Sequence, residues 1–317
     1  MNPAVSVIVL TYNQEHCIAR TLDSVLRQEV RGGLEVVIGD DASTDSTRAI
    51  CEDYAGRYPG LIRLMPPAPN KGLVRNYYDC LAACRGRYIT DCAGDDECID
   101  GAHLQHMSDI LDADSRMVAV AADWVEHDML SGSDNLVSAS APRSHAGLFT
   151  SEGKFSLFLS AVLYRRDVIV DDMERNPNLF VAPEFPCEDL PLFFALLTHG
   201  YFGHHPAPAR RYNIGEGTVS RPKELQRIFR QTAAWLESLL ALCGIYGVAM
   251  DDVQPALDRK MDYMISLAFA MRSRDARSHI ESLLRRNRYS LTAKSRLKLA
   301  VMRFPALWRV IKNAAYR

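Results

Sequence analysis

The sequence has no long hydrophobic run. Its longest apolar stretch is the 12 residues LLALCGIYGVAM, which begin at Leu239 and include two glycines. A helix that spans a bilayer needs about 20 apolar residues, so we expect no integral membrane segment. The run VSVIVL, which begins at Val5, is too short for the hydrophobic region of a secretory leader. These absences predict a cytoplasmic protein, either soluble or peripheral at the inner face of the membrane.

Cysteine spacing typical of metal sites is also lacking. The eight cysteines include no CxxC pair, so we expect reduced packing residues rather than a structural zinc site. His199, His204 and His205 lie close together in the sequence, and we interpret them as structural, because isolated histidines are more often structural than metal ligands. No internal repeat is present.

The chain lacks a large excess of either charge, since its net charge is −2, but the charge is unevenly spread. Residues 272–317 contain 13 Lys or Arg against two acids, Asp275 and Glu281, which gives +11. The preceding residues therefore carry about −13 by difference. A basic end on an acidic body indicates an anionic partner for that end. No nucleic-acid recognition motif is visible, so we expect no nucleic-acid partner.

Short β-branched runs alternate with helical patterns through the first 90 residues. Predicted strands cover residues 5–10, 34–39, 61–65 and 87–90. Predicted helices cover residues 14–28, 46–58 and 74–84. This alternation predicts an α/β fold of Rossmann-like type, with a mainly parallel sheet.

The second half of the chain is less regular. The pattern predicts helices over 103–113 and 188–198, strands over 117–125 and 157–164, a mobile loop over 128–150 and a Pro- and Gly-containing connection over 203–221. Everything after Pro222 has a helical pattern. We therefore predict two domains, 1–221 and 222–317.

Two acidic clusters follow predicted strands. Asp40 and Asp41 end one strand, and Asp95 and Asp96 follow another about 55 residues later. Ligands of α/β sheets bind at the carboxyl ends of the strands. Adjacent carboxylates repel each other unless a cation lies nearby, and Mg²⁺ or Mn²⁺ prefers oxygen ligands. The pattern predicts a divalent cation and a phosphate-bearing substrate, although each pair could also begin a surface turn.

Other polar residues suit a nucleotide. Thr11, Tyr12 and Asn13 end the first strand, where an aromatic ring could stack on a base or simply cap the strand. Lys71 and Arg75 are four residues apart at a predicted helix start. Basic groups are unfavourable there unless an anion such as a diphosphate lies between them, although Lys71 could equally be a solvated loop charge.

Glu188 and Asp189 begin a later predicted helix. A carboxylate in a cleft can remove a proton from an attacking hydroxyl. Acids are also favoured in a first helical turn for their charge alone, so these residues by themselves leave both readings open.

Six segments in this order and spacing resemble glycosyltransferase family 2, whose members have the GT-A fold. The resemblance covers roughly residues 4–221 and rests on VSVIVLTYNQ, LEVVIGDDASTDST, NKGLVRN, GRYITDCAGDDE, SAVLYRRDV and CEDLPLFFALLTHG. It implies a GT-A catalytic domain over 1–221 and a helical C-terminal region over 222–317. It also implies an inverting enzyme that moves a sugar from a nucleotide diphosphate, expected to be UDP, to a hydroxyl of a glycan or lipid-linked acceptor. Bacterial surface polysaccharide synthesis is the expected setting.

The resemblance assigns roles to the nucleotide side of the site. Tyr12 and Asp41 would contact the base, and Arg75 would lie near the base or the phosphates. Asp95 would bind the ribose, and Asp96 would bind Mn²⁺ or Mg²⁺.

It also assigns the acceptor side. Asp189 would be the general base, Glu188 would support it or the acceptor, and Arg165 or Arg166 would position substrate.

The sequence departs from the family pattern at two places. Ala93 stands where many relatives have an acid, and Gly215 stands where many have a histidine. These departures leave a non-catalytic nucleotide-sugar-binding protein as an alternative. A nucleotidyltransferase is another, although no Gly-rich phosphate loop followed by lysine is present near the N-terminus.

The C-terminal segment SLTAKSRLKLAVMRFPALWRVIKNAAYR interleaves apolar and basic residues. This pattern predicts an amphipathic helix on anionic lipid, divided at Pro305. A helix docked on protein with a solvated basic face is the alternative.

Overall fold

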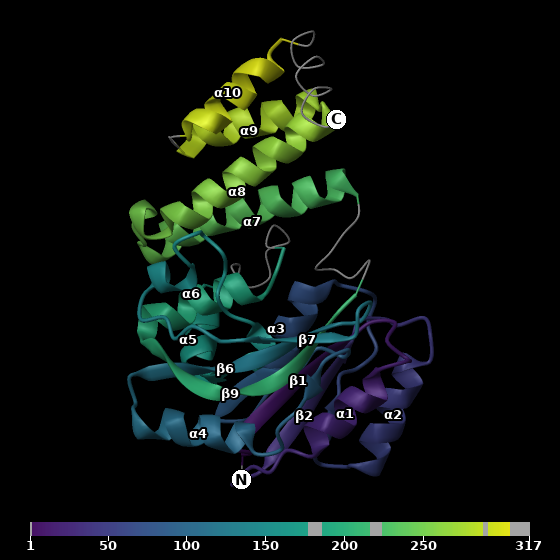
Figure 1. Cartoon of the computed structure of the whole chain (residues 1–317). Helices are drawn as coiled ribbons and strands as arrows, with labels where there is room; N and C mark the ends of the chain where they lie inside the picture. Colours follow the sequence, from purple (N-terminus) through teal and green to yellow (C-terminus); the bar gives the residue numbers. More distant parts are fainter. Residues whose placement is uncertain (1, 177–185, 216–223, 288–290, 305–317) are drawn as a thin grey trace. The chain divides into compact units, whose positions relative to one another are not determined.

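A computed structural model describes residues 2–176, 186–215, 224–287 and 291–304. The chain divides into two compact units (Figure 1). The first comprises Met1–Leu148 and Ser156–Gly215, and the second comprises Phe149–Phe155 and Glu216–Arg317. The boundary predicted near residue 221 lies outside the described residues.

The first unit is built on one nine-stranded sheet in the order β3-β2-β1-β4-β8-β6-β9-β5, with β7 paired to β6. Its strands are β1 Val5–Thr11, β2 Leu34–Asp40, β3 Ile62–Leu64, β4 Tyr88–Asp91, β5 Glu97–Cys98, β6 Met117–Asp128, β7 Ser133–Val137, β8 Val162–Arg165 and β9 Tyr201–Ile214. Strands β3, β2, β1 and β4 are parallel, as are β6 and β9. Strand β8 is antiparallel to both β4 and β6 and joins the two parallel groups. The predicted α/β architecture is confirmed.

Register brings the polar strand ends to one edge of the sheet. Thr11 at the end of β1 pairs with Asp40 at the end of β2. Strand β4 ends earlier, where Asp91 pairs with Ile8. The chain after β4 then continues beside β1, since the Gly94 N–H donates to the Leu10 carbonyl at 2.9 Å.

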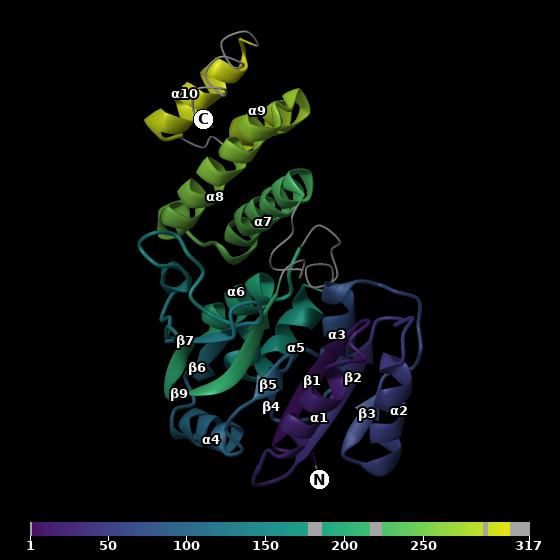
Figure 2. The ribbon, with the colours of Figure 1, turned by 45° about the vertical axis from the view of Figure 1, so that its right-hand side comes forward.

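Six α-helices flank this sheet: α1 Ile18–Leu26, α2 Thr47–Arg57, α3 Leu73–Ala83, α4 His103–Ala113, α5 Arg166–Arg175 and α6 Asp189–His199. Strands β1 and β2 are buried on both faces, as β-branched strands in parallel sheets generally are. Alternate residues of β1 (Val5, Val7 and Val9) belong to one core cluster with residues of α1, α2 and α4. Figure 2 shows α2 beside β3 and α4 beside β9.

The structure corrects four expectations. The predicted connection 203–221 is strand β9 as far as Ile214. The predicted loop 128–150 contains β7, and the strand predicted over 157–164 begins only at Val162. Helix α5 was not expected. Strand β9 was missed because Pro206 and Pro208 suggest a break. Proline has no N–H to donate to a neighbouring strand, but the pairing of β9 with β6 changes register around these two residues, so the strand continues past them.

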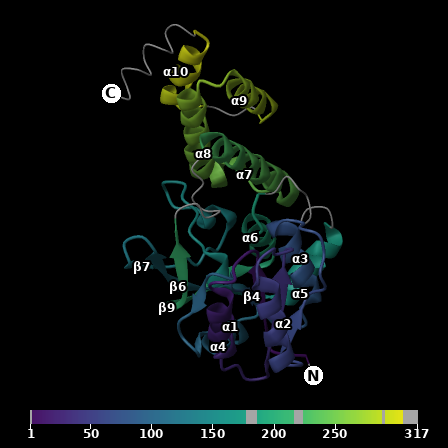
Figure 3. The same cartoon turned by 90° about the vertical axis from the view of Figure 1, so that its right-hand side faces the viewer.

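The second unit is helical, as predicted. Its helices are α7 Leu225–Tyr246, α8 Met250–Met271, α9 Arg274–Asn287 and α10 Ala293–Met302. Helices α7 and α8 run alongside each other (Figure 3), and α8 also contacts α9 and α10. Gly153 of the short first segment packs on α8 with φ +71°, and a Cβ there would lie 2.2 Å from the Pro255 carbonyl oxygen. In the described part of the chain, no helix combines the length and the apolar character needed to span a bilayer. Pro305 and the residues after it lie outside the described residues.

Candidate active site

The loops after β1 and β2 form one hydrogen-bonded unit. The Asp41 N–H donates to the Thr11 carbonyl at 3.0 Å. The Asn13 side chain, on a residue with φ +52°, accepts from the Thr44 N–H at 2.7 Å. Tyr12, between Thr11 and Asn13 in the sequence, has 49% of its surface exposed. An exposed aromatic ring fixed beside buried polar backbone is suited to stack on a planar ligand.

Asp41 is almost fully buried and fixes the loop before α3. Its two carboxylate oxygens accept the Lys71 and Gly72 N–H groups, each at 2.9 Å. The Lys71 Nζ lies 2.7 Å from Asp79, and the Arg75 Nε lies 3.2 Å from the same carboxylate. The structure therefore brings Lys71 and Arg75 together as expected, and Asp79 is the anion that they share. Their role toward a diphosphate stays a prediction.

The acidic loop after β4 is tightly held. Asp96 N–H donates to the Ala93 carbonyl at 2.9 Å and closes a turn. The Thr21 hydroxyl on α1 contacts the carbonyls of Gly94 and Asp96, at 2.9 and 2.7 Å. The chain at Gly94 runs close to β1, because a Cβ there would lie 3.0 Å from the Leu10 carbonyl oxygen and would displace the end of the Gln14 side chain.

The two adjacent acids of this loop differ in access. Asp96 is completely buried, and its Oδ1 accepts the Asn213 N–H at 3.3 Å, whereas Oδ2 has no hydrogen-bond partner among the described residues. Burial and the Asp95 charge raise the pKa of Asp96 well above its usual range. Asp95 is only partly buried, and burial raises its pKa more modestly. The carboxylate oxygens of the pair fit a hard cation in chemistry, but solvent reaches only Asp95.

The start of α6 adds a second pair of carboxylates to this edge. Asp189 Oδ1 accepts the Leu190 N–H at 2.7 Å, and the Tyr78 hydroxyl on α3 donates to the Glu188 carbonyl at 2.8 Å. Burial, together with the Asp189 and Asp91 charges, raises the pKa of Glu188 to about 8. Burial likewise raises the pKa of Asp91 to about 6, and the Asp189 charge adds to it. The structure thus brings Glu188 and Asp189 near Asp91, which was not selected from the sequence.

The raised pKa of Glu188 predicts a pH-dependent stability. Between pH about 4.5 and about 8 the folded protein keeps a proton on Glu188 that the unfolded chain releases, so the free energy of unfolding falls as pH rises. Glu188→Gln removes this effect. The wild type therefore loses stability from pH 5 to pH 8 and the variant does not. The free energy of unfolding of the variant minus that of the wild type should increase by about 1 kcal/mol or more over this range.

Urea denaturation at the two pH values measures this difference. The control is Glu174→Gln, at an exposed position on α5, which should follow the wild type at both pH values. A Glu188→Gln variant that also follows the wild type would contradict the shifted pKa.

Arg165 and Arg166 do not lie at this edge. Arg165 pairs with Tyr88, at the opposite end of β4 from Asp91. Its guanidinium donates to the Leu111 and Met117 carbonyls at 2.6 and 2.8 Å. The Arg166 Nε donates to the Cys84 carbonyl at 2.8 Å. The expectation that they position substrate is wrong, because both bind backbone carbonyls at the far edge of the sheet.

Arg210, whose buried guanidinium carries a positive charge at this site, was not selected from the sequence. Arg210 on β9 has no solvent exposure, and its Nη2 donates to the Asp91 carbonyl at 3.3 Å. Its Nη1 contacts His103 Nε2, and His103 Nδ1 lies 2.5 Å from the Asp100 carbonyl. Burial and the Arg210 charge lower the pKa of His103, so the neutral ring accepts from Arg210 and donates to Asp100. Arg210 therefore connects both ends of the acidic loop. It was missed because residues 203–221 were interpreted as a connection.

The fold and this acidic edge define an α/β domain of the glycosyltransferase type. The family model described as "Glycosyl transferase family 2" matches residues 6–171, which are 166 of the 317 residues. The chain belongs to glycosyltransferase family 2, a family of transferases, and the predicted family is confirmed.

The chain is also similar to curated bacterial proteins, one of which is named a glycosyltransferase. EpsE of Bacillus subtilis is 39% identical over 94 residues, which are 30% of this chain and 34% of EpsE. The succinoglycan biosynthesis protein ExoO of Rhizobium meliloti is 27% identical over 244 residues, which are 73% of this chain and 67% of ExoO. An uncharacterized Mycobacterium bovis protein is 41% identical over 107 residues. The match to that protein spans only 31% of its length.

Solved structures share the fold. TarS of S. aureus, in a complex with UDP-GlcNAc, aligns with a TM-score of 0.68 at 17% identity and covers 100% of this chain and 93% of the TarS chain. The mannosyltransferase PcManGT of Pyrobaculum calidifontis, in complex with GDP-Man and Mn²⁺, aligns with a TM-score of 0.53 at 18% identity, over 100% of this chain and 89% of its own. The predicted GT-A fold is confirmed.

Proposed function

We propose that this protein is an inverting glycosyltransferase that moves a sugar from a UDP-linked donor to a hydroxyl of a glycan or lipid-linked acceptor. The observation that carries the proposal is the meeting of two acidic elements at one sheet edge. The start of α6 brings Glu188 and Asp189 near Asp91, at the end of the strand that leads into the acidic loop. A direct displacement needs the base and the donor site to be neighbours.

Asp189 is the proposed general base. In a single displacement the acceptor oxygen forms a bond to the anomeric carbon while the bond to the diphosphate oxygen breaks on the opposite face. Asp189 takes the proton of the attacking hydroxyl, and the diphosphate leaves with the bonding electrons. Glu188, with a pKa near 8, is largely protonated at neutral pH and can donate a hydrogen bond to Asp189 or to the acceptor.

The nucleotide side consists of the loops after β1 and β2. Tyr12 and the Thr11–Asn13 turn are proposed to hold the base, and Asp41 to support it through the loop that it fixes. Lys71 and Arg75 are proposed to exchange part of their contact with Asp79 for the donor diphosphate. The diphosphate adds negative charge beside Asp79, and the two basic side chains together with the proposed cation would neutralise part of it.

A divalent cation, Mn²⁺ or Mg²⁺, is proposed to bind the donor diphosphate, with Asp95 as its protein ligand. Asp96 was the residue expected from the sequence, but its complete burial favours Asp95 as the ligand and Asp96 as the anchor of the loop to Asn213. When bound, such a cation neutralises charge on the leaving diphosphate.

The relatives support the donor class and the biological setting. TarS structures contain UDP-GlcNAc or UDP, and the PcManGT structure contains GDP-Man with Mn²⁺. ExoO is a succinoglycan biosynthesis protein. We therefore propose a nucleotide-sugar donor and a role in bacterial surface polysaccharide synthesis at the cytoplasmic side.

Thermal denaturation with nucleoside diphosphates and nucleotide sugars, with and without Mn²⁺, tests the donor site. At 100 times its dissociation constant a ligand adds about 2.7 kcal/mol to stability, so UDP with Mn²⁺ should raise the Tm by several degrees. Asp95→Asn should abolish the Mn²⁺-dependent part of this shift. Glu97→Gln, whose carboxylate pairs with Arg20 at 3.0 Å, should retain it.

Two outcomes would contradict these assignments. A full Mn²⁺-dependent shift in Asp95→Asn would remove Asp95 as the cation ligand. No shift with any nucleotide would remove the donor site itself.

We also propose that the C-terminal basic segment contacts an anionic membrane surface. On α10, the last described helix, Leu297 is 66% exposed, and Phe304 just beyond it is 63% exposed. Basic and apolar side chains on one exposed segment are suited to the lipid headgroup region. The full chain should float with liposomes that contain phosphatidylserine and should be released by high salt. Sedimentation away from both neutral and anionic liposomes would contradict this proposal.

A further inference from the structure

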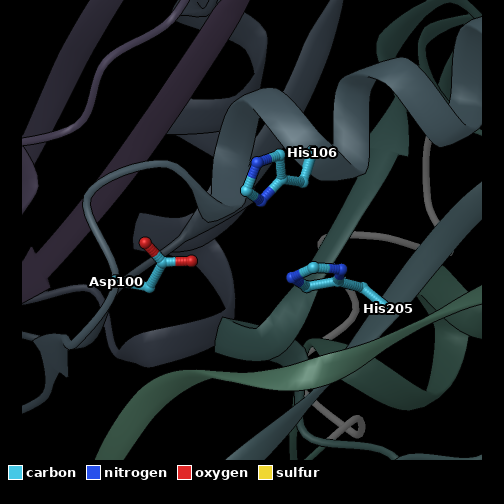
Figure 4. A group of neighbouring side chains, drawn as sticks. All are labelled: Asp100, His106 and His205. Carbon is cyan, nitrogen blue, oxygen red and sulfur yellow. The ribbon is translucent and has the colours of Figure 1, made fainter.

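A group of metal-binding side chains lies apart from the carboxylates assigned to the donor. Asp100 precedes α4, His106 lies on α4 and His205 lies on β9. One ligand atom from each residue lies within 4.8 Å of those of the other two. Figure 4 shows the Asp100 carboxylate and the two imidazole rings pointing toward a common point. Within the residues that the structure describes, no other group of three His, Cys, Asp or Glu side chains meets this criterion.

Packing holds two of these groups in place. The Ala102 N–H donates to Asp100 Oδ1 at 2.9 Å and orients the carboxylate. His205 lies where the pairing of β6 with β9 changes register, between the pairs Ala122–His205 and Asp123–Pro208. Its Nε2 is buried and has no hydrogen-bond partner among the described residues. A buried imidazole nitrogen without a partner is costly, and a metal ion would satisfy it.

We propose that Asp100, His106 and His205 bind a zinc ion. Zinc is held at about 2.0–2.2 Å by imidazole nitrogen and carboxylate oxygen, so tetrahedral ligand atoms lie about 3.3 Å apart. The ligand atoms lie up to 4.8 Å apart, so binding requires the exposed His106 side chain to turn toward the other two ligands. Water from the solvent completes the fourth position.

The ligand types distinguish this site from the donor cation. Two imidazoles and one carboxylate favour borderline metals such as Zn²⁺ or Co²⁺ over Mg²⁺, which prefers oxygen ligands. Millimolar Mg²⁺ should therefore leave the proposed site available to zinc. Zinc binding at this site also requires no nucleotide.

The site would fasten the acidic loop to β9. The Asp100 carbonyl already accepts from the Gln28 side chain at 2.7 Å and faces His103, which contacts Arg210. A metal bound to Asp100 and His205 adds a link between the end of the acidic loop and the strand that carries Arg210. The zinc ion is therefore inferred to cross-link these two segments while keeping one position open to water, and its removal should lower thermal stability in the absence of substrate.

Metal titration of the full chain after chelator treatment tests the proposal. Wild-type protein in millimolar Mg²⁺ should bind one equivalent of Co²⁺ with the visible absorption of a low-coordinate ion, and Zn²⁺ should displace it. Zn²⁺ at 100 times its dissociation constant should raise the Tm by about 5 °C. His106→Gln and His205→Gln should each lose the absorption and the Tm rise. His106 is exposed, so its variant should fold even if replacement of His205 disturbs β9.

Two control variants separate this site from its neighbours. His204→Gln changes the adjacent histidine, which binds Asp123 at 2.7 Å, and should retain the cobalt spectrum. Asp95→Asn changes the proposed donor ligand and should also retain it. Absence of a cobalt spectrum in wild type, or an unchanged spectrum in His106→Gln, would overturn the zinc site and leave the proposed transferase function untouched.

Discussion

Asparagine in place of Asp189 is expected to lower kcat by about 10²–10⁴-fold, with donor binding largely unchanged. General-base catalysis typically contributes a factor of this size, and asparagine keeps the shape of the side chain but cannot accept the proton. The carboxylate lies at the first turn of α6, outside the loops proposed to hold the nucleotide. Steady-state kinetics with the donor identified by thermal denaturation, together with the donor-induced Tm shift, measures both quantities.

Helix α5 offers a matched control for this variant. Asp167 also lies in a first helical turn, and its Oδ1 accepts the N–H of the next residue, Val168, at 3.0 Å. Asp167→Asn removes the same favourable charge at a helix start, at the far edge of the sheet, and should leave kcat within a factor of about two. Near wild-type turnover in Asp189→Asn would show that another group is the base. Equal losses in the two variants would show a general effect on stability.

The first half of the fold was predictable because its local patterns agree with its packing. Strands β1 and β2 are short β-branched runs buried on both faces, and α1 presents Ile18, Leu22 and Val25 to them. In the second half local patterns and packing disagree. Strand β9 contains two prolines within a register shift, and α5 buries only Ile169 and Asp172, which leaves almost no periodic signal.

The carboxylates at the sheet edge were predictable for a different reason. Parallel strands end at one edge, so acids after successive strands converge there whatever the details of packing. Which of Asp95 and Asp96 is buried could not be predicted, because adjacent residues in a turn face different surroundings. The complete burial of Asp96 and the contact of its Oδ1 with the Asn213 N–H show that Asp96 faces inward. Arg210 was beyond sequence reasoning, since its distant partners are His103 and the Asp91 carbonyl, 107 and 119 positions away.

Replacement of Arg210 by methionine is expected to lower the free energy of unfolding by about 3–5 kcal/mol. Removal of one member of a buried charged network leaves the others without compensation, and methionine fills the volume without the charge. The neighbouring variant Arg211→Met removes an exposed ion pair with Asp134 and should cost about 1 kcal/mol or less. Urea denaturation of the two variants compares a buried and an exposed arginine on the same strand.

The pH dependence of the Arg210→Met deficit identifies its cause. The Arg210 charge lowers the pKa values of Asp91 and Asp96, which burial raises, so both values should rise further in the variant. An acid with a raised pKa in the folded state holds a proton that the unfolded chain releases, and stability then falls as pH rises. The deficit relative to wild type should therefore be larger at pH 8 than at pH 5. A deficit that is equal at both pH values would indicate lost packing, and the compensation of buried acids by Arg210 would then be wrong.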